Sequence, residues 1–569
     1  MTNANIYTLL HRAWTDPAAV ALYDCPDVAG AEVTYGALDA AVARAAAALA
    51  ERGLVPGDRL AMALPKSTAT FVLFLAALRS GLTLVPCNPA SPAQGVAAML
   101  ERTDPALVLV DAEAPAGPIA LAARTAGARV DTVAAGAGLD PLSSGSASDA
   151  APDPMSLDGG AGVDPLPSEN AADAGRDALS SHNGADVTPA VLTGDHPAII
   201  LFTSGSTGAP KGVPITHGAL AGQARALCDA WQITAADRLL HVLPMTHAHG
   251  LIISLLPLLL AGGAICLRGR FEPGDVVARL PRASCFMGVP FTYAQLMDHP
   301  GFDAPACATI RLFVSGSAPL PDDLRQGFEA RTGHPLLERY GMTETLISTA
   351  NGPASHRGGS VGRPLPGVDL RIRPLGAPDG PDAAPGEEGE VELRGPSVLS
   401  GYLAAPDQTA GAFAPDGFFR TGDLGRLDAD GFLSITGRAK DLIVYAGLKV
   451  HPAEVEAALR ELDEIGDACV FGVPHPSAGE AVMAAVVLRP GAGATSPAAL
   501  RGQLIGSLPP SHVPRRIHVL ADLPRNAMGK LQRNVLRDWH ADGRLAAGGD
   551  GGAGAETGAQ PGLCADTKR

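Results

Sequence analysis

Residues 203–212, with the sequence TSGSTGAPKG, combine the residue types that bind phosphate groups. Glycines let backbone N–H groups turn toward a ligand, hydroxyls donate further hydrogen bonds, and Lys211 adds positive charge. The spacing differs from G-x-x-x-x-G-K-[ST], which disfavours a P-loop nucleotide hydrolase. We predict a polyphosphate-binding loop of another kind. Its expected contact residues are Thr203, Ser204, Gly205, Ser206, Thr207, Gly208 and Lys211.

Alternating strand and helix patterns surround this loop and must position it. A strong apolar run starts at Ala198 and leads into the loop, and Ala-rich amphipathic helices alternate with short apolar runs between residues 35 and 110. This pattern predicts an α/β fold with a large N-terminal domain of βαβ-type sheets. The predicted strands of this part are 59–64, 82–86 and 106–110.

The chain is longer than the ~250–300 residues at which single cores stop growing, so at least two domains are expected. From Gly386 the pattern becomes richer in strands, which predicts a β-rich subdomain within an N-terminal domain of residues 1–439. A small, mobile C-terminal α+β lid domain is expected over residues 441–539. It should contain helices at 452–461 and 497–507 and strands at 468–473 and 482–488.

Two segments have too few bulky apolar residues to bury a core. Residues 134–187 consist mainly of Gly, Ala, Asp, Ser and Pro, and we expect a disordered insertion there. The Gly/Ala-rich residues 540–569 are expected to form a disordered tail.

Charge and hydropathy exclude several classes of protein. The formal net charge of -16 argues against general affinity for nucleic acid or anionic membranes. The sequence contains no run of ~18 apolar residues that would indicate a membrane span, and residues 1–14 lack a signal-peptide pattern. We therefore expect a cytoplasmic protein. The eight cysteines include no C-x-x-C pair, which argues against a zinc site or a disulfide framework.

The phosphate loop is the first of five motifs that occur in a fixed order. The others are YGMTET at 340–345, FRTGDLG at 419–425, GRAKDLI at 437–443 and PRNAMGK at 524–530. Together they resemble the adenylate-forming (AMP-binding) superfamily, which contains acyl-CoA synthetases, carrier-protein adenylation domains and firefly luciferase. The resemblance spans the chain except the insertion and the tail. It implies that ATP activates a carboxylic acid as an acyl-adenylate, and that the acyl group then passes to coenzyme A with release of AMP and pyrophosphate.

The resemblance also assigns roles to individual residues. Attack of a carboxylate on the α-phosphorus builds charge on phosphate oxygens, so cations must be aimed there. Lys530 corresponds to the adenylation lysine and Glu344 to the Mg²⁺ carboxylate, with Thr343 as a phosphate donor; Lys211 completes the catalytic set. Asp423 and Arg438 are expected at the ribose. The expected adenine contacts are Ser315, Gly316, Ser317, Ala318, Pro319, Tyr340, Gly341 and Met342.

For the second half-reaction, the resemblance implies a rotation of the small domain. Lys440 is expected to be the hinge. After the rotation, Gly447 and Lys449 would line the tunnel for the pantetheine arm of coenzyme A.

Within the superfamily, LPMTHAHGL at 243–251 and RTGHPLLERYGMTET at 331–345 are most similar to malonyl-CoA synthetases. A dicarboxylate substrate needs a partner for its second charge, and Arg357 and His249 are the predicted partners. Thr246 stands where these enzymes usually carry an aromatic residue. Alternative substrates are methylmalonate, another short dicarboxylate, or a short fatty or aryl acid. Alternative functions are a free-standing enzyme that loads a carrier protein, a luciferase-type oxidation, and a non-catalytic nucleotide-binding relative.

Overall fold

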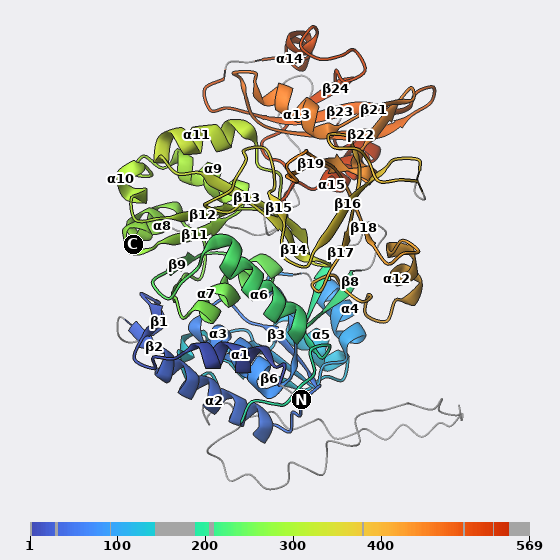
Figure 1. Ribbon diagram of the computed structural model, residues 1–569. Coiled ribbons are helices and arrows are strands. Elements are labelled where there is room, and N and C mark those ends of the chain that lie inside the picture. Colours follow the sequence, from blue (N-terminus) through green and yellow to red (C-terminus); the bar gives the residue numbers. More distant parts are fainter. Residues whose placement is uncertain are drawn as a thin grey trace, which may run out of the picture. The chain divides into compact units, whose positions relative to one another are not determined.

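The computed structural model describes residues 3–28, 32–91, 93–142, 188–203, 210–377, 380–492, 495–526 and 529–545 (Figure 1). The chain divides into two units, residues 1–439 and 440–569. No helix in the described ranges is both long and apolar enough to cross a membrane.

A six-stranded sheet in the first unit carries the phosphate-loop motif. Its strand order is β6-β5-β3-β4-β7-β8, parallel except for the last pair. Its strands are β3 (Arg59–Ala63), β4 (Thr83–Pro86), β5 (Leu107–Asp111), β6 (Val130–Val133), β7 (Pro197–Thr203) and β8 (Lys211–Thr216).

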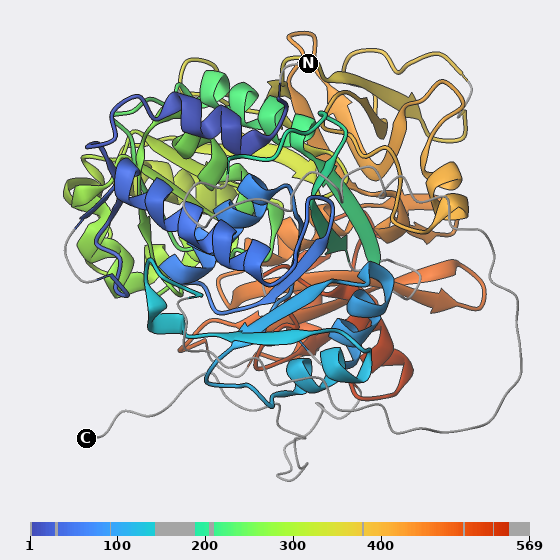
Figure 2. The same cartoon turned by 90° about the horizontal axis from the view of Figure 1, so that it is seen from below.

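Helices cover both faces of this sheet (Figure 2). Successive strand residues point to opposite faces, and in β3 both Leu60 and its neighbour Ala61 are fully buried. Ala61 packs with Leu100 and Ala123 from two helices in one apolar cluster. A strand buried on both faces reads as a continuous apolar run, which explains why these strands were predictable from sequence. The helices of this region are α1 (Ile6–Ala13), α2 (Tyr35–Glu51), α3 (Thr68–Ser80), α4 (Ala93–Thr103) and α5 (Pro118–Thr125).

A nine-stranded sheet, also in the first unit, has the order β15-β14-β13-β12-β11-β9-β10-β1-β2. The central strands from β13 to β1 are parallel, and the outer pairs are antiparallel. The strands are β1 (Val20–Tyr23), β2 (Glu32–Thr34), β9 (Arg238–His241), β10 (Ala264–Leu267), β11 (Cys285–Gly288), β12 (Leu312–Ser315), β13 (Leu336–Met342), β14 (Leu346–Ala350) and β15 (Arg363–Pro364). Its helices are α6 (His217–Trp231), α7 (Leu255–Ala261), α8 (Pro273–Arg279), α9 (Pro290–Asp298), α10 (Ala304–Cys307) and α11 (Asp322–Thr332).

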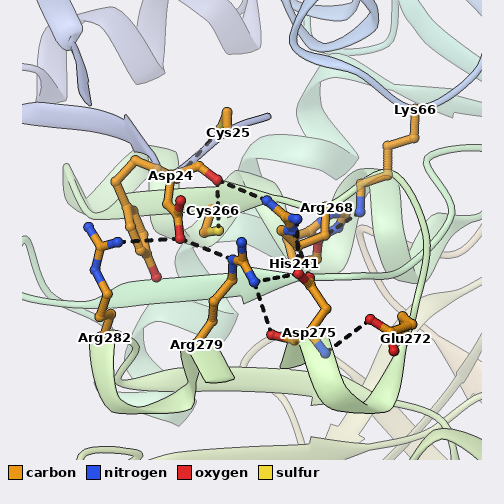
Figure 3. A network of polar contacts seen from close by, with 11 residues as sticks. Asp24, Cys25, Lys66, His241, Cys266, Arg268, Glu272, Asp275, Arg279 and Arg282 are labelled. Atoms are coloured by element: carbon orange, nitrogen blue, oxygen red, sulfur yellow. Dashed lines mark hydrogen bonds and ion pairs between the residues drawn. The ribbon is translucent and has the colours of Figure 1, made fainter. Parts of the chain in front are cut away.

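Polar contacts connect these two sheets and fix one end of the nine-stranded sheet (Figure 3). Lys66, which follows β3 of the six-stranded sheet, donates a hydrogen bond of 2.8 Å to the carbonyl oxygen of His241 at the end of β9. Close by, Arg268 pairs with Asp275 at 2.8 Å and also reaches the backbone of Asp24 after β1. The contacts hold the end of β9 where the chain turns toward residues 243–251.

A four-stranded antiparallel sheet completes the first unit and was predicted as the β-rich subdomain. Its order is β16-β17-β18-β19. The elements of this part are β16 (Asp369–Pro374), β17 (Gly389–Arg394), α12 (Pro406–Ala412), β18 (Phe419–Leu427) and β19 (Leu433–Arg438).

The second unit is an α+β domain built on a five-stranded sheet. Its elements are β20 (Ile443–Tyr445), β21 (Leu448–Val450), α13 (Pro452–Arg460), β22 (Ile465–His475), β23 (Gly479–Leu488), α14 (Pro497–Leu504), β24 (Arg516–Val519) and α15 (Arg533–Ala541). The predicted helices and strands of this segment all occur, with shifts of a few residues at their ends.

The two segments predicted to be disordered lie only partly within the described residues. Residues 135–137 form a single 3₁₀ turn, and residues 143–187 lie outside the described ranges. The predicted tail starts one residue before the end of α15, and Leu545 packs into the apolar cluster of Cys469 and Phe471. Residues 540–545 are therefore part of the domain. Residues 546–569 lie outside the described ranges.

Candidate active site

The predicted adenine-contact residues lie at and after the carboxyl ends of the parallel strands β12 and β13, where open α/β sheets bind ligands. Gly288, Ser315 and Glu338 are register neighbours on β11, β12 and β13. The predicted adenine loop therefore starts beside the strand that leads into YGMTET. In that loop Ser315 and Gly316 are buried, Ser317 and Ala318 are half-buried, and Pro319 is exposed.

Residues 343–345 form a tight turn between β13 and β14. A Cβ on Gly341 would lie 1.8 Å from the carbonyl oxygen of Leu346, so only glycine fits there. Thr345 ties the turn to itself, because its N–H donates to the carbonyl oxygen of Met342 at 3.2 Å. The turn exposes part of Thr343 and buries Glu344, whose exposed fraction is 6%.

Glu344 is a buried carboxylate surrounded by donors and cations. Burial raises its pKa, and the Tyr402 hydroxyl, Arg438 and Lys211 act in the opposite direction. Lys211 stands opposite Thr203 in the β7–β8 hairpin, at the base of the phosphate loop. The fold thus brings Lys211, Glu344 and Arg438 together from three motifs that are far apart in sequence.

Asp423 lies between Tyr340 and Arg438. The Tyr340 hydroxyl donates to Oδ2 of Asp423 at 2.7 Å, and Arg438 Nε contacts Oδ1 at 2.8 Å. Burial and the neighbouring Asp423 raise the pKa of Tyr340 well above its usual range. The sequence predicted Tyr340 only as a stacking ring, and its hydrogen bond to Asp423 is an addition from the structure.

A buried arginine, Arg339, lies next to the adenine loop. It is 6% exposed, and burial lowers its pKa to about 10. Its contacts with that loop are a hydrogen bond of 3.3 Å to the Ser317 hydroxyl and close packing on Gly316, where a Cβ would lie 2.4 Å from the guanidinium. No carboxylate pairs with Arg339 among the residues that the structure describes.

His249 lies beside the same hydroxyl, with Nδ1 3.3 Å from Ser317 Oγ. It begins a π-helical turn, η3 (His249–Ile253), a type of turn that often occurs at functional sites. A Cβ on Gly250 would lie 2.1 Å from the Pro244 carbonyl oxygen, so the turn needs glycine there. Burial and the charge of Arg339 hold the pKa of His249 well below its usual range, and the ring is neutral at pH 7.

Arg357, the other predicted partner for a second carboxylate, lies elsewhere. Its guanidinium is exposed, pairs with Asp428 and Asp430, and stacks over Phe432 at 4.4 Å. Because two carboxylates already neutralise this guanidinium at the surface, it would gain little interaction energy from a third carboxylate on a substrate. The role of Arg357 at a second carboxylate stays a prediction, and Arg339 is an arginine beside His249 without a carboxylate partner among the described residues.

The remaining predicted residues belong to other parts of the chain. Ser204, Ser206, Thr207 and the glycines Gly205 and Gly208 lie outside the described residues.

Four predicted residues belong to the second unit. Lys440 is its first residue, and Gly447 and Lys449 lie in and after the β20–β21 turn. Lys530 is half-buried in the loop before α15, and its backbone N–H donates to Asn526 Oδ1 at 3.0 Å. The hinge, tunnel and adenylation roles stay predictions.

Two site residues were missed from sequence. Arg339 had a visible signal, because LLERYGM places two adjacent charged residues, Glu338 and Arg339, in a strand of the fold; the motif next to them drew attention to Tyr340 instead. Tyr402 had no signal of its own, since it contacts Glu344 across 58 positions of sequence.

Comparison with models of known protein families shows to which family the chain belongs. The model of the AMP-binding enzyme family matches residues 9–403, and the model of its C-terminal domain matches residues 454–530. The chain belongs to the AMP-binding enzyme family. The family assignment agrees with the resemblance seen in the five motifs.

Individual relatives are named CoA ligases. A sulfoacetate–CoA ligase of Cupriavidus necator is 34% identical over 90% of this chain and 93% of its own length. A malonate–CoA ligase of Arabidopsis thaliana is 36% identical over 60% of each chain. The crystal structure of ATP-bound MatB from Rhodopseudomonas palustris superposes with a TM-score of 0.83 at 34% identity, over 95% of this chain and 99% of that one. This chain is therefore an acid–thiol ligase of the same fold.

Proposed function

We propose that this protein is an ATP-dependent CoA ligase for malonate or a similar small acid that carries a second negative charge. The observation that carries the proposal is Arg339, a buried arginine without a carboxylate partner in the described residues. A buried charge is costly unless it is paired. A buried arginine without a protein carboxylate beside it therefore suits an anionic ligand, which would supply the missing charge.

The surroundings of Arg339 support an anion pocket. His249 Nε2, Ser315 Oγ and Arg339 Nε are all buried side-chain atoms for which the described residues supply no hydrogen-bond partner. Buried polar atoms are normally paired, so a cluster of such atoms indicates a missing ligand. The second carboxylate of malonate would accept hydrogen bonds from these groups, and a sulfonate would do so in the same way.

In the first half-reaction, the first unit would bind ATP and orient it. Asp423 would accept hydrogen bonds from the ribose hydroxyls and Tyr340 would stack on adenine, while Lys211 and Thr343 would hold phosphate oxygens. Lys530 would neutralise the charge that develops between the carboxylate and the α-phosphate. Each of these groups binds, orients or stabilises charge without forming a covalent bond.

Magnesium fits the donor set around Glu344. The described residues contain no group of three or more His, Cys, Asp or Glu side chains suited to a metal ion. One carboxylate with the neighbouring Thr343 hydroxyl suits Mg²⁺, which keeps several waters and shares its ligands with ATP. Bound there, the ion would neutralise phosphate charge.

Release of AMP across a panel of acids tests the proposed substrate class. The panel contains malonate, methylmalonate, sulfoacetate, succinate, oxalate, acetate, butyrate, octanoate and benzoate, each with ATP, Mg²⁺ and CoA. We expect the highest kcat/KM for malonate or another short acid with two negative charges. A preference for acetate, butyrate or benzoate would contradict the anion pocket and leave the ligase reaction standing.

Arg339→Met tests the pocket directly, with Arg357→Ala as its matched control. Loss of the buried partner should lower kcat/KM for the dianionic acid by at least ~30-fold, or about 2 kcal/mol, while butyrate changes much less. Arg357→Ala should change kcat/KM for neither acid by more than a few-fold, because Arg357 already forms ion pairs with Asp428 and Asp430. A selective loss in Arg357→Ala with none in Arg339→Met would restore the sequence-based assignment.

The acceptor can be checked in the same way. CoA is the favoured thiol because the relatives above are named CoA ligases. Thioester formation with free CoA supports this choice. Adenylate formation without acyl-CoA would favour a carrier protein.

A further inference from the structure

Residues 399–403 cross between the two catalytic motifs of the first unit and bond to each of them. The N–H of Leu399 donates to the carbonyl oxygen of Glu344 at 2.7 Å. Four residues later, the N–H of Leu403 donates to the carbonyl oxygen of Gly212 at 2.9 Å, directly after Lys211. The segment therefore links the backbone of the phosphate-loop hairpin to that of the 343–345 turn.

Tyr402 makes the same connection with its side chain. Its hydroxyl donates a hydrogen bond of 3.2 Å to Glu344 Oε1. The ammonium of Lys211 lies 4.6 Å from the centroid of the Tyr402 ring, within the range of a cation–π contact. One side chain thus contacts the acidic and the basic residue predicted to act on the phosphates.

The backbone around Tyr402 is held from a third side. Its N–H donates to Thr409 Oγ1 of α12 at 2.9 Å, and Thr409 Oγ1 in turn donates to the carbonyl oxygen of Ala405. Packing is close at Gly212, where a Cβ would lie 3.1 Å from the Cβ of Leu403. A side chain whose backbone is fixed in this way loses little further entropy when it orients its neighbours.

The hydrogen bond matters because Glu344 is buried. Only 6% of Glu344 is exposed, so a protein donor such as the Tyr402 hydroxyl replaces hydrogen bonds that water would otherwise supply. A donor to one carboxylate oxygen also fixes the plane of the group.

We propose that Tyr402 is a positioning residue that orients Glu344 through its hydroxyl and Lys211 through its ring. It acts through these two side chains and has no assigned contact with substrate. The inference rests on the proposed roles of Glu344 toward Mg²⁺ and of Lys211 toward phosphate. It is independent of which acid the enzyme activates.

Binding of ATP without any acid, measured by titration calorimetry with and without Mg²⁺, tests the proposal. Tyr402→Phe removes the hydroxyl and keeps the ring. We expect it to weaken ATP binding at least ~5-fold with Mg²⁺ and to raise the Mg²⁺ concentration needed for half-maximal activity. Binding without Mg²⁺ should stay near wild type. Tyr402→Leu also removes the ring, and it should weaken ATP binding under both conditions.

Tyr7→Phe is the matched control, because the Tyr7 hydroxyl also donates to a carboxylate, Asp39 Oδ1, at 2.6 Å. It deletes the same type of hydrogen bond away from the site. Any general effect of the deletion on stability should appear in its melting temperature, with ATP and Mg²⁺ binding unchanged. An equal loss of Mg²⁺-dependent binding in Tyr7→Phe would overturn the proposal.

A double-mutant cycle with Glu344→Gln separates positioning from mere packing. If Tyr402 acts through Glu344, Tyr402→Phe should cause no further loss of Mg²⁺-dependent binding in the Glu344→Gln background. Additive losses would overturn the proposal, as would wild-type Mg²⁺ dependence in Tyr402→Phe. Failure of the acid panel would leave these binding results untouched, so the two proposals fail separately.

Discussion

The Tyr340 hydroxyl donates to Asp423 Oδ2 at 2.7 Å, which joins the end of a parallel strand to the four-stranded sheet across 83 positions of sequence. The bond holds the carboxylate predicted to bind ribose, and Arg438 holds its other oxygen. A two-point acceptor works best when it is fixed before the ligand arrives, because the entropy of ordering it is already lost.

Tyr340→Phe should therefore weaken ATP binding while the ring stays in place. Loss of a hydrogen bond to a charged group costs about 1.5–3 kcal/mol, or on the order of 10–100-fold in the KM for ATP. The KM for the acid should change little. Tyr35→Phe, which removes a buried hydroxyl bonded to the Gly263 carbonyl oxygen, is the control for the loss of a buried hydroxyl. Parallel changes in both KM values would argue that the hydroxyl serves folding alone.

Arg339→Met should leave the melting temperature unchanged or raise it. The substitution removes a buried charge that has no protein counter-ion in the described residues. Arg311→Met is the contrasting variant, because Arg311 Nε contacts the buried Asp237 at 2.7 Å. Its loss leaves that carboxylate without its cation, which should lower the stability by about 3–5 kcal/mol. Thermal melts of both variants check the comparison. A large destabilisation by Arg339→Met would show that this arginine serves the fold.

Lys530→Ala should abolish adenylate formation and largely spare thioester formation from supplied acyl-adenylate. Only the first half-reaction needs an ammonium beside the α-phosphate. Lys449→Ala, at an exposed position of strand β21, should show the reverse pattern, with a raised KM for CoA. Pyrophosphate exchange and single-turnover thioester assays distinguish the two steps. Equal loss of both steps in Lys530→Ala would contradict this division.

Glu338 should make stability fall as pH rises from about 4.5 to 7. Burial raises its pKa from 4.5 to about 7, against the lowering effect of Arg325. Between these values the folded chain binds more protons at this site than the unfolded chain, so unfolding becomes easier as pH increases. Glu338→Gln should flatten this dependence and raise the melting temperature at pH 8 relative to wild type. An unchanged difference between wild type and variant from pH 4.5 to 8 would argue against the raised pKa.

Strands that are buried on both faces were the most predictable part of the fold. Ala61 and Leu60 belong to opposite faces of one strand, and both are apolar, so the run is visible without any partner. The β-rich subdomain was predictable from Gly386 onward, because turn sequences and short strands replace the Ala-rich helices there. The order of the nine strands was not predictable, since pairing between β9 and β11 depends on contacts far apart in the chain.

Within the site, residues inside motifs were predictable and residues that hold them were not. Glu344 and Asp423 stand in sequences whose spacing is informative by itself. Tyr402 stands in an irregular segment, and its contacts with Glu344 and Lys211 become apparent only in the folded chain. Arg357 shows the opposite case: its loop suggested a ligand, but Asp428 and Asp430, 71 and 73 residues later, satisfy its charge.

The hydrogen bond from Lys66 to His241 has a consequence for how the large unit opens. Lys66 follows β3 and His241 ends β9, so one contact joins a strand of each large sheet. His241 also contacts the Gly250 carbonyl oxygen through Nε2 at 2.8 Å, inside the turn that carries His249. Local unfolding of that turn then breaks contacts that reach the six-stranded sheet as well. Backbone amides of η3, β9 and β3 should therefore exchange with deuterium as one cooperative unit, slower than a surface turn of the same length.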